Sequence, residues 1–105
     1  MNPIYYIKQN DTLPSLVAQL MDSDGEIDLT GATVMLIARS GTRMITKPCV
    51  INNPLIGLIS VHLDESETSH CGHYRAEFEI TYIFGGEKLT VPNDGYFDII
   101  ITEDL

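Results

Sequence analysis

The feature that most constrains the fold is a strict alternation of apolar and polar residues from position 74 to position 82. One set of positions holds Tyr74, Ala76, Phe78, Ile80 and Tyr82, and the intervening set holds Arg75, Glu77, Glu79 and Thr81. Successive side chains of a β-strand point to opposite faces, so this segment presents an apolar face to a core and a polar face to solvent. The three- to four-residue period of an amphipathic helix is nearly absent from the chain.

Similar alternation recurs along the whole chain, and turn-forming residues separate the segments. We expect further strands at residues 4–9, 15–22, 33–39, 44–50, 57–63, 88–91 and 96–102. Turns are expected at residues 24–25, 40–41, 52–54, 85–86 and 93–95, and one helical turn at residues 64–68 with Asp64 as its cap. These elements predict an all-β fold, an immunoglobulin-like antiparallel β-sandwich of about 7–8 strands.

Length and composition favour one folded unit. A chain of 105 residues with 44% hydrophobic residues has room for one core, and no linker or repeat divides it. We therefore expect a single β-sandwich domain over residues 1–105.

The charge of the chain argues against two classes of partner. Six Lys and Arg residues against fifteen Asp and Glu residues leave a net charge of -9, which repels nucleic acid and anionic membrane surfaces. No apolar run approaches the roughly 20 residues that span a bilayer, and the N-terminal residues do not resemble a signal peptide. We expect no nucleic-acid partner, no membrane partner and synthesis in a cytosol.

Two clusters could suggest a metal site. His70, Cys71 and His73 lie close together, with Cys49 as a distant fourth ligand, but the second ligand pair that structural zinc sites usually have is missing. The simpler interpretation is a loop before the alternating segment, with both cysteines as small, partly buried thiols.

The second cluster is acidic. Asp22, Asp24 and Asp28 surround Gly25 and could suggest calcium, yet they lack the spacing of an EF-hand. Asp is common in turns between strands, so we predict no metal at either cluster.

No catalytic constellation is visible. Glu77 and Glu79 could form a carboxylate pair, but the alternation places them on the solvated face, and His62 stands alone on a strand. The serines lack a nucleophile elbow, and Gly85-Gly86 lacks the spacing of a phosphate-binding loop. We expect no enzymatic activity and no cofactor.

Aromatic residues leave a second class of function open. Tyr5, Tyr6, Tyr96 and Phe97 could contribute a stacking platform for sugar, although the chain has no Trp. A carbohydrate-binding or adhesion module is therefore the alternative hypothesis.

Three stretches, taken in order, resemble a known family. They are residues 27–34 (IDLTGATV), 72–80 (GHYRAEFEI) and 91–96 (VPNDGY), and residues 8–12 with Pro14 fit the same pattern. The chain is similar in this respect to the N-terminal domain of the upper baseplate proteins of siphophage tails, the BppU N-terminal family. The resemblance implies an immunoglobulin-like sandwich that works as a structural module of a phage or prophage tail by docking to other virion tail proteins, made in the bacterial cytoplasm.

The last predicted strand is the candidate contact edge. Phe97, Ile99 and Ile101 alternate with Tyr96, Asp98 and Ile100, so this strand is apolar on most of both faces. Edge strands of a small sandwich must be shielded or paired. We predict self-association or a protein contact at Tyr96, Phe97, Ile99 and Ile101, with residues 4–8 as a second edge.

Overall fold

The alternating segment forms the longest strand, β9 (Gly72–Tyr82), of a computed structural model that describes residues 4–92 and 95–104. The side chains of Tyr74, Ala76, Phe78 and Ile80 are buried, and the polar set lies on the opposite face. The alternation therefore predicted the orientation of this strand correctly.

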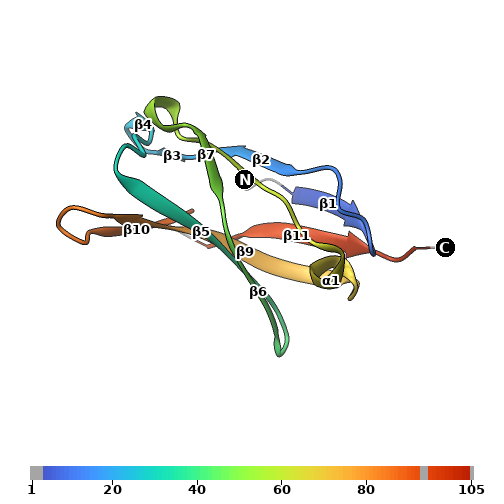
Figure 1. The fold of residues 1–105 in the computed structure, drawn as a ribbon. Coiled ribbons are helices and arrows are strands. Elements are labelled where there is room, and N and C mark those ends of the chain that lie inside the picture. The colour runs from blue at the N-terminus through green and yellow to red at the C-terminus, as the bar shows by residue number, and fades with distance from the viewer. Residues whose placement is uncertain (1–3, 93–94, 105) are drawn as a thin grey trace.

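β9 lies at the centre of a six-stranded sheet, which we call sheet A (Figure 1). Its other strands are β1 (Ile4–Lys8), β5 (Ala32–Ser40), β6 (Arg43–Pro48), β10 (Lys88–Val91) and β11 (Phe97–Thr102). The order is β1-β11-β9-β5-β6, and β10 pairs with the part of β9 beyond the end of β11.

A smaller sheet, sheet B, covers one face of sheet A (Figure 1). It consists of β2 (Leu16–Gln19), β8 (Leu58–Val61) and β7 (Val50–Asn53), in that order. A short hairpin of β3 (Met21–Asp22) and β4 (Gly25–Glu26) extends beyond β2, and the 3-10 helix η1 (Pro54–Ile56) and the helix α1 (Glu65–Thr68) connect strands.

The core lies between the inner faces of the two sheets. It comprises Ile7, Leu16, Leu20, Ile27, Leu29, Val34, Leu36, Ala38, Ile45, Ile59, Val61, Leu63, Tyr74, Ala76, Phe78, Ile80, Phe97, Ile99 and Ile101. The rings of Phe78 and Phe97 stack with their centroids 5.0 Å apart. The chain is thus an all-β sandwich, as its sequence predicts.

One pairing departs from the antiparallel arrangement that we expected. β1 pairs with β11 in parallel, from Ile4 opposite Asp98 to Lys8 opposite Thr102. Hairpins force antiparallel pairing, but no short connection joins the first and last strands, so their relative direction is free.

Several strand boundaries also differ from the prediction. The segment 15–22 divides at Leu20 into β2 and β3, and the segment 44–50 ends as β6 at Pro48, before β7 begins in the other sheet. Residues 52–53 belong to β7 and residues 54–56 to η1 instead of forming a simple turn. Hairpins at residues 24–25, 40–41 and 85–86 are confirmed, whereas the expected turn at 93–95 lies partly outside the described residues.

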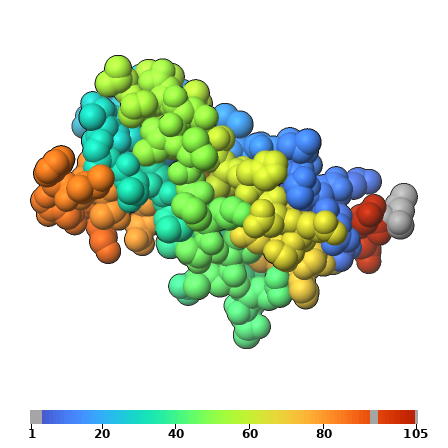
Figure 2. Space-filling view, in the orientation of Figure 1, coloured from blue at the N-terminus to red at the C-terminus, as the bar shows by residue number. Residues whose placement is uncertain are grey.

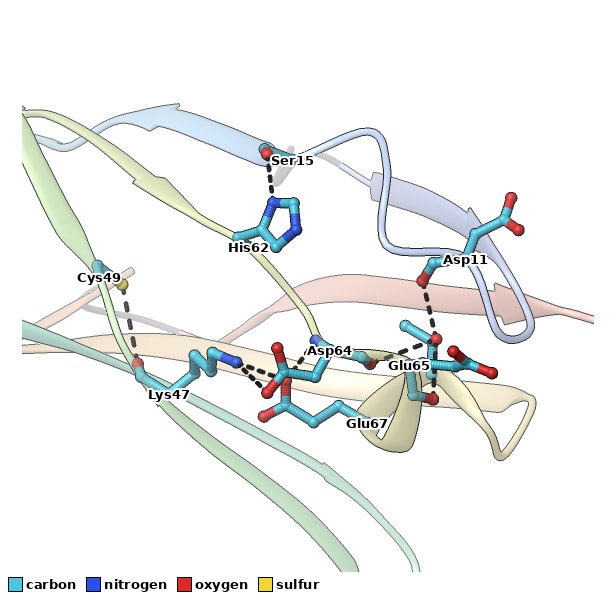
Figure 3. Close-up of polar contacts among 9 residues, drawn as sticks. Asp11, Ser15, Lys47, Cys49, His62, Asp64, Glu65 and Glu67 are labelled. Carbon is cyan, nitrogen blue, oxygen red and sulfur yellow. Dashed lines mark hydrogen bonds and ion pairs between the residues drawn. The ribbon is translucent and has the colours of Figure 1, made fainter.

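The predicted helical turn is present and is bound to β6 of sheet A and to the loop between β1 and β2 (Figure 3). The backbone N–H of Asp64 donates a hydrogen bond of 2.7 Å to Glu67 Oε1, and Lys47 of β6 forms ion pairs with Asp64 at 2.8 Å and Glu67 at 2.9 Å. The buried Thr68 hydroxyl donates to the carbonyl of Asp11 at 2.8 Å. These contacts hold α1 against the sandwich.

A tight turn at residues 28–31 sets up the start of β5. Asp28 Oδ1 accepts hydrogen bonds from the Thr30 hydroxyl at 2.6 Å and from the Thr30 backbone N–H at 2.9 Å. These two bonds hold the pKa of Asp28 below its ordinary value of 3.8, and the bond from the Thr30 hydroxyl has the larger effect. Gly31 follows with a φ of 74°, a conformation that a Cβ disfavours.

Candidate protein-binding surfaces

The predicted contact edge at the last strand is not an edge. β11 lies between β1 and β9, and both of its sides are paired. Phe97, Ile99 and Ile101 point into the core with exposed fractions of 5%, 0% and 2%. The prediction of a free edge was wrong because the alternation that makes β11 apolar reflects burial inside the sandwich. Tyr96, just before β11, is exposed, and a protein contact there stays a prediction.

The second predicted edge, residues 4–8, is free on one side. β1 pairs only with β11 among the described strands, and β2, across the opening between the sheets, pairs only with β8. A groove of about 670 Å³ lies between them. Phe78 and Phe97 are part of its lining, together with the exposed side chains of Ile4, Val17 and Met21. We call this hollow the β1–β2 groove.

Another apolar surface lies at the tip of the β9–β10 hairpin. Ile83 and Phe84 are 67% and 86% exposed, and Gly85 and Gly86 complete the turn with positive φ angles. Figure 2 shows this hairpin, in orange, projecting at one end of the molecule. Large apolar side chains at such a position often contact a partner.

The outer face of sheet A carries a hollow of about 850 Å³ with a different chemistry. Arg39, Arg75, His73 and Glu77 line it, together with Tyr96. The Arg75 guanidinium lies 5.3 Å from the centre of the Tyr96 ring. Next to Arg75 on β9, His73 Nε2 lies 2.5 Å from the Oδ1 of Asp98.

The side chains of the possible zinc cluster are directed to different partners. His70 Nδ1 pairs with the Ser69 hydroxyl at 2.9 Å and His73 pairs with Asp98, while Cys71 is exposed. Cys49 packs against the core, and burial raises the pKa of its thiol to about 12. The expectation of partial burial therefore holds for Cys49 and was wrong for Cys71, which lies in the exposed loop before β9.

The acidic cluster is used for turn formation. Asp22 Oδ1 accepts a hydrogen bond of 2.8 Å from the Asp24 backbone N–H, and Asp28 binds Thr30. In residues 4–92 and 95–104, no three His, Cys, Asp or Glu side chains gather closely enough to hold a metal ion.

One polar pair was not recognised in the sequence. Ser15 Oγ lies 3.1 Å from Nδ1 of His62, just beyond the end of the β2–β8 pairing at Leu16 and Val61 (Figure 3). The two residues are 47 positions apart, so no local motif links them. A catalytic Ser-His pair needs a third group that orients the His, and no carboxylate among the described residues contacts His62.

The two carboxylates considered as a pair, Glu77 and Glu79, lie half-buried on the outer face of sheet A.

The aromatic residues considered for sugar binding do not form one platform. Tyr5 is half-buried and its hydroxyl donates to the Pro14 carbonyl, and Phe97 is stacked in the core. Tyr6 and Tyr96 are exposed, with Tyr96 against Arg75.

The described helices include none long and apolar enough to cross a membrane.

Comparisons with known proteins agree with this architecture. The family model described as BppU N-terminal domain matches residues 1–103. A solved structure described as the N-terminal domain of phage TP901-1 ORF48 is similar with a TM-score of 0.71 and 15% sequence identity, over 94% of this chain and 84% of that chain. At this identity the structural similarity concerns the fold alone. A comparison with curated proteins finds no match.

Proposed function

Because the chain belongs to the BppU N-terminal domain family, we propose that it is a non-enzymatic module of a phage or prophage tail baseplate that docks to other virion proteins. The observation that carries this proposal is the family match over residues 1–103, nearly the whole chain. Such a module is made in the cytoplasm of the host bacterium and becomes part of the virion tail.

The surfaces of the sandwich support a role in binding. β1 and β2 each leave one backbone edge unpaired among the described strands, and an edge of this kind can pair with an extended segment of another chain. The β1–β2 groove between them offers apolar contacts at Ile4, Val17 and Met21. We propose that an extended segment of a neighbouring tail protein lies along this groove.

Co-expression with the tail and baseplate proteins of the same genome tests the proposal. The tagged chain is expected to copurify with at least one of them. Its failure to copurify with any, together with a gene neighbourhood that lacks tail genes, would contradict the proposal.

A matched pair of variants tests the groove. Val17 on β2 lines the groove and is 64% exposed, whereas Val50 on β7 is 61% exposed at the opposite edge of sheet B. Val17→Asp is expected to abolish copurification and Val50→Asp to preserve it, with thermal melts showing that both variants fold. Equal effects of the two substitutions would exclude the groove as the contact.

Self-association belongs to the same proposal, since a free edge can also pair with a second copy. Sedimentation equilibrium is expected to show an assembly larger than the monomer as protein concentration rises. A strict monomer at the highest soluble concentration would contradict self-association and leave the docking to other tail proteins intact.

A further inference from the structure

Two arginines face each other on the outer side of sheet A. Arg39 of β5 and Arg75 of β9 are directly opposite partners in the strand register, and both side chains are exposed. Like charges directly opposite in a sheet destabilise it. This arrangement is unexpected in a chain that has only six Lys and Arg residues against fifteen Asp and Glu residues.

Carboxylates lie near this pair without contacting it. Asp98 of β11 is the register partner of Arg75 on its other side, but its side chain pairs with His73. Glu77 lines the same hollow, yet no described acidic side chain lies within 4.0 Å of either guanidinium. The Arg75 guanidinium is instead held against the Tyr96 ring at 5.3 Å. Arg75 is thereby oriented by an aromatic face, which leaves its N–H donors available.

We infer that the hollow around Arg39 and Arg75 binds carboxylate side chains of an acidic segment on a partner protein, and that Tyr96 positions Arg75 for this contact. Guanidinium groups bind carboxylates in a bidentate manner, and an arriving carboxylate would remove the repulsion between the two arginines. This inference rests on the proposed function and deepens it by naming the chemistry of the partner.

The remaining charges favour a protein segment over nucleic acid. The net charge of -9 on this chain would repel a nucleic-acid backbone along the whole length of that backbone. A short acidic segment of a protein needs to contact only this hollow. The contact is separate from the β1–β2 groove, because Arg39 and Arg75 lie on the outer face of sheet A and the groove opens between the two sheets.

Two single variants with the same change in charge test the site on the full chain. Arg75→Gln removes one member of the pair, and Lys88→Gln removes an exposed lysine of β10 in the same sheet. The arginine variant is expected to weaken binding to the copurifying tail protein about tenfold or more, and the lysine variant to change it far less. Equal weakening by both variants, or none by the arginine variant, would overturn the inference.

A second experiment is independent of any tail protein. In an NMR titration with a synthetic peptide of consecutive glutamates, the side-chain Nε–H signals of Arg39 and Arg75 are expected to shift, and a DNA duplex at the same ionic strength is expected to leave them unchanged. Shifts with the peptide but no copurifying tail protein would preserve this site and contradict the proposed function. No shift with the peptide, or shifts with DNA alone, would overturn the site.

The stability of the free chain provides a third measurement. Arg39→Gln is expected to raise the thermal midpoint because it removes the repulsion, even though it weakens partner binding. A lower midpoint would show that Arg39 has a structural role and would contradict the inference.

Discussion

The hydroxyl of Tyr82 donates a hydrogen bond of 2.7 Å to the backbone carbonyl of Asp28, which lies 54 residues earlier in the chain. The bond links the end of the central strand β9 to the turn that precedes β5. A second bond, from the Ile83 backbone N–H to the Gly31 carbonyl at 2.9 Å, lies beside it. Together they fasten the turn at residues 28–31 to the base of the β9–β10 hairpin.

Tyr82→Phe removes only the hydroxyl of this contact. We expect a loss of about 0.5–1.5 kcal/mol in the free energy of unfolding, measured by urea denaturation, because the Asp28 carbonyl loses its partner. Tyr6→Phe is the control, since Tyr6 is 59% exposed and makes no hydrogen bond to another described residue. Equal losses in the two variants would show that the bond does not stabilise the turn.

Thr30→Val is expected to reveal a pH-dependent contribution at the same turn. The pKa of Asp28 is lowered in the folded state, so its stabilisation is present above about pH 3.8 and is lost as the pH falls through the folded pKa. The difference in the free energy of unfolding between the wild type and Thr30→Val is therefore expected to become smaller below pH 3.8 in urea titrations. Thr33→Val, at an exposed position of β5, is expected to give a gap that does not vary with pH.

Lys47→Met tests the ion pairs that hold α1. Burial lowers the pKa of Lys47, but the hydrogen bonds and charges of Asp64 and Glu67 outweigh this effect and raise the pKa above its ordinary value of 10.5. The stabilisation by the ion pairs is therefore fully present below pH 10.5 and is lost as the pH rises through the pKa of the folded state. At neutral pH we expect a loss of about 1 kcal/mol in the free energy of unfolding. This value is at the upper end of the range for surface ion pairs, because the side chains of Lys47 and Glu67 are each only 20% exposed. In about 1 M salt this loss is expected to shrink.

Lys88→Met provides the comparison for Lys47→Met. Lys88 is exposed on β10 and forms no ion pair with a described residue, so its replacement is expected to have little effect at either salt concentration. A salt-independent loss in Lys47→Met would indicate that lost packing, and not charge, explains the effect.

Ile99→Ala is expected to lower the free energy of unfolding by roughly 2–5 kcal/mol, because Ile99 is fully buried and the surrounding core can collapse only in part. Ile4→Ala, at a position that is 50% exposed, is expected to cost much less. Chemical denaturation of both variants checks this contrast. A small cost at Ile99 would contradict the placement of β11 inside the sandwich.

The two thiols are expected to react at very different rates. Cys71 is exposed, whereas burial raises the pKa of Cys49 to about 12, so at mildly alkaline pH a thiol reagent is expected to modify Cys71 rapidly and Cys49 only after unfolding. Cys71→Ser is expected to remove the fast phase. Rapid modification of Cys49 in the folded chain would contradict its burial.

Local patterns predicted the elements whose signals are local. The alternation at Tyr74 identified β9 and its buried face, Gly85-Gly86 identified the β9–β10 hairpin, and Asp64 identified the start of α1. In each case the deciding residues lie within a few positions of one another. The physical preferences of the backbone are then sufficient to specify the element.

Relationships between distant strands could not be predicted in this way. The pairs Ser15–His62 and Arg39–Arg75 depend on the register of strands that the sequence does not align. The position of β11 depends on β1, at the other end of the chain, occupying its free side. An apolar strand looks the same in sequence whether a second sheet, a neighbouring strand or another protein covers it.

The parallel pairing of β1 with β11 has a mechanical consequence. A force that pulls Ile4 and Thr102 apart acts along both strands in opposite directions, so it loads the backbone hydrogen bonds between them in shear. These bonds share the load and must break together, whereas an antiparallel pair pulled from its open end separates one bond at a time. The sandwich is therefore arranged to carry tension from its first strand to its last without unravelling.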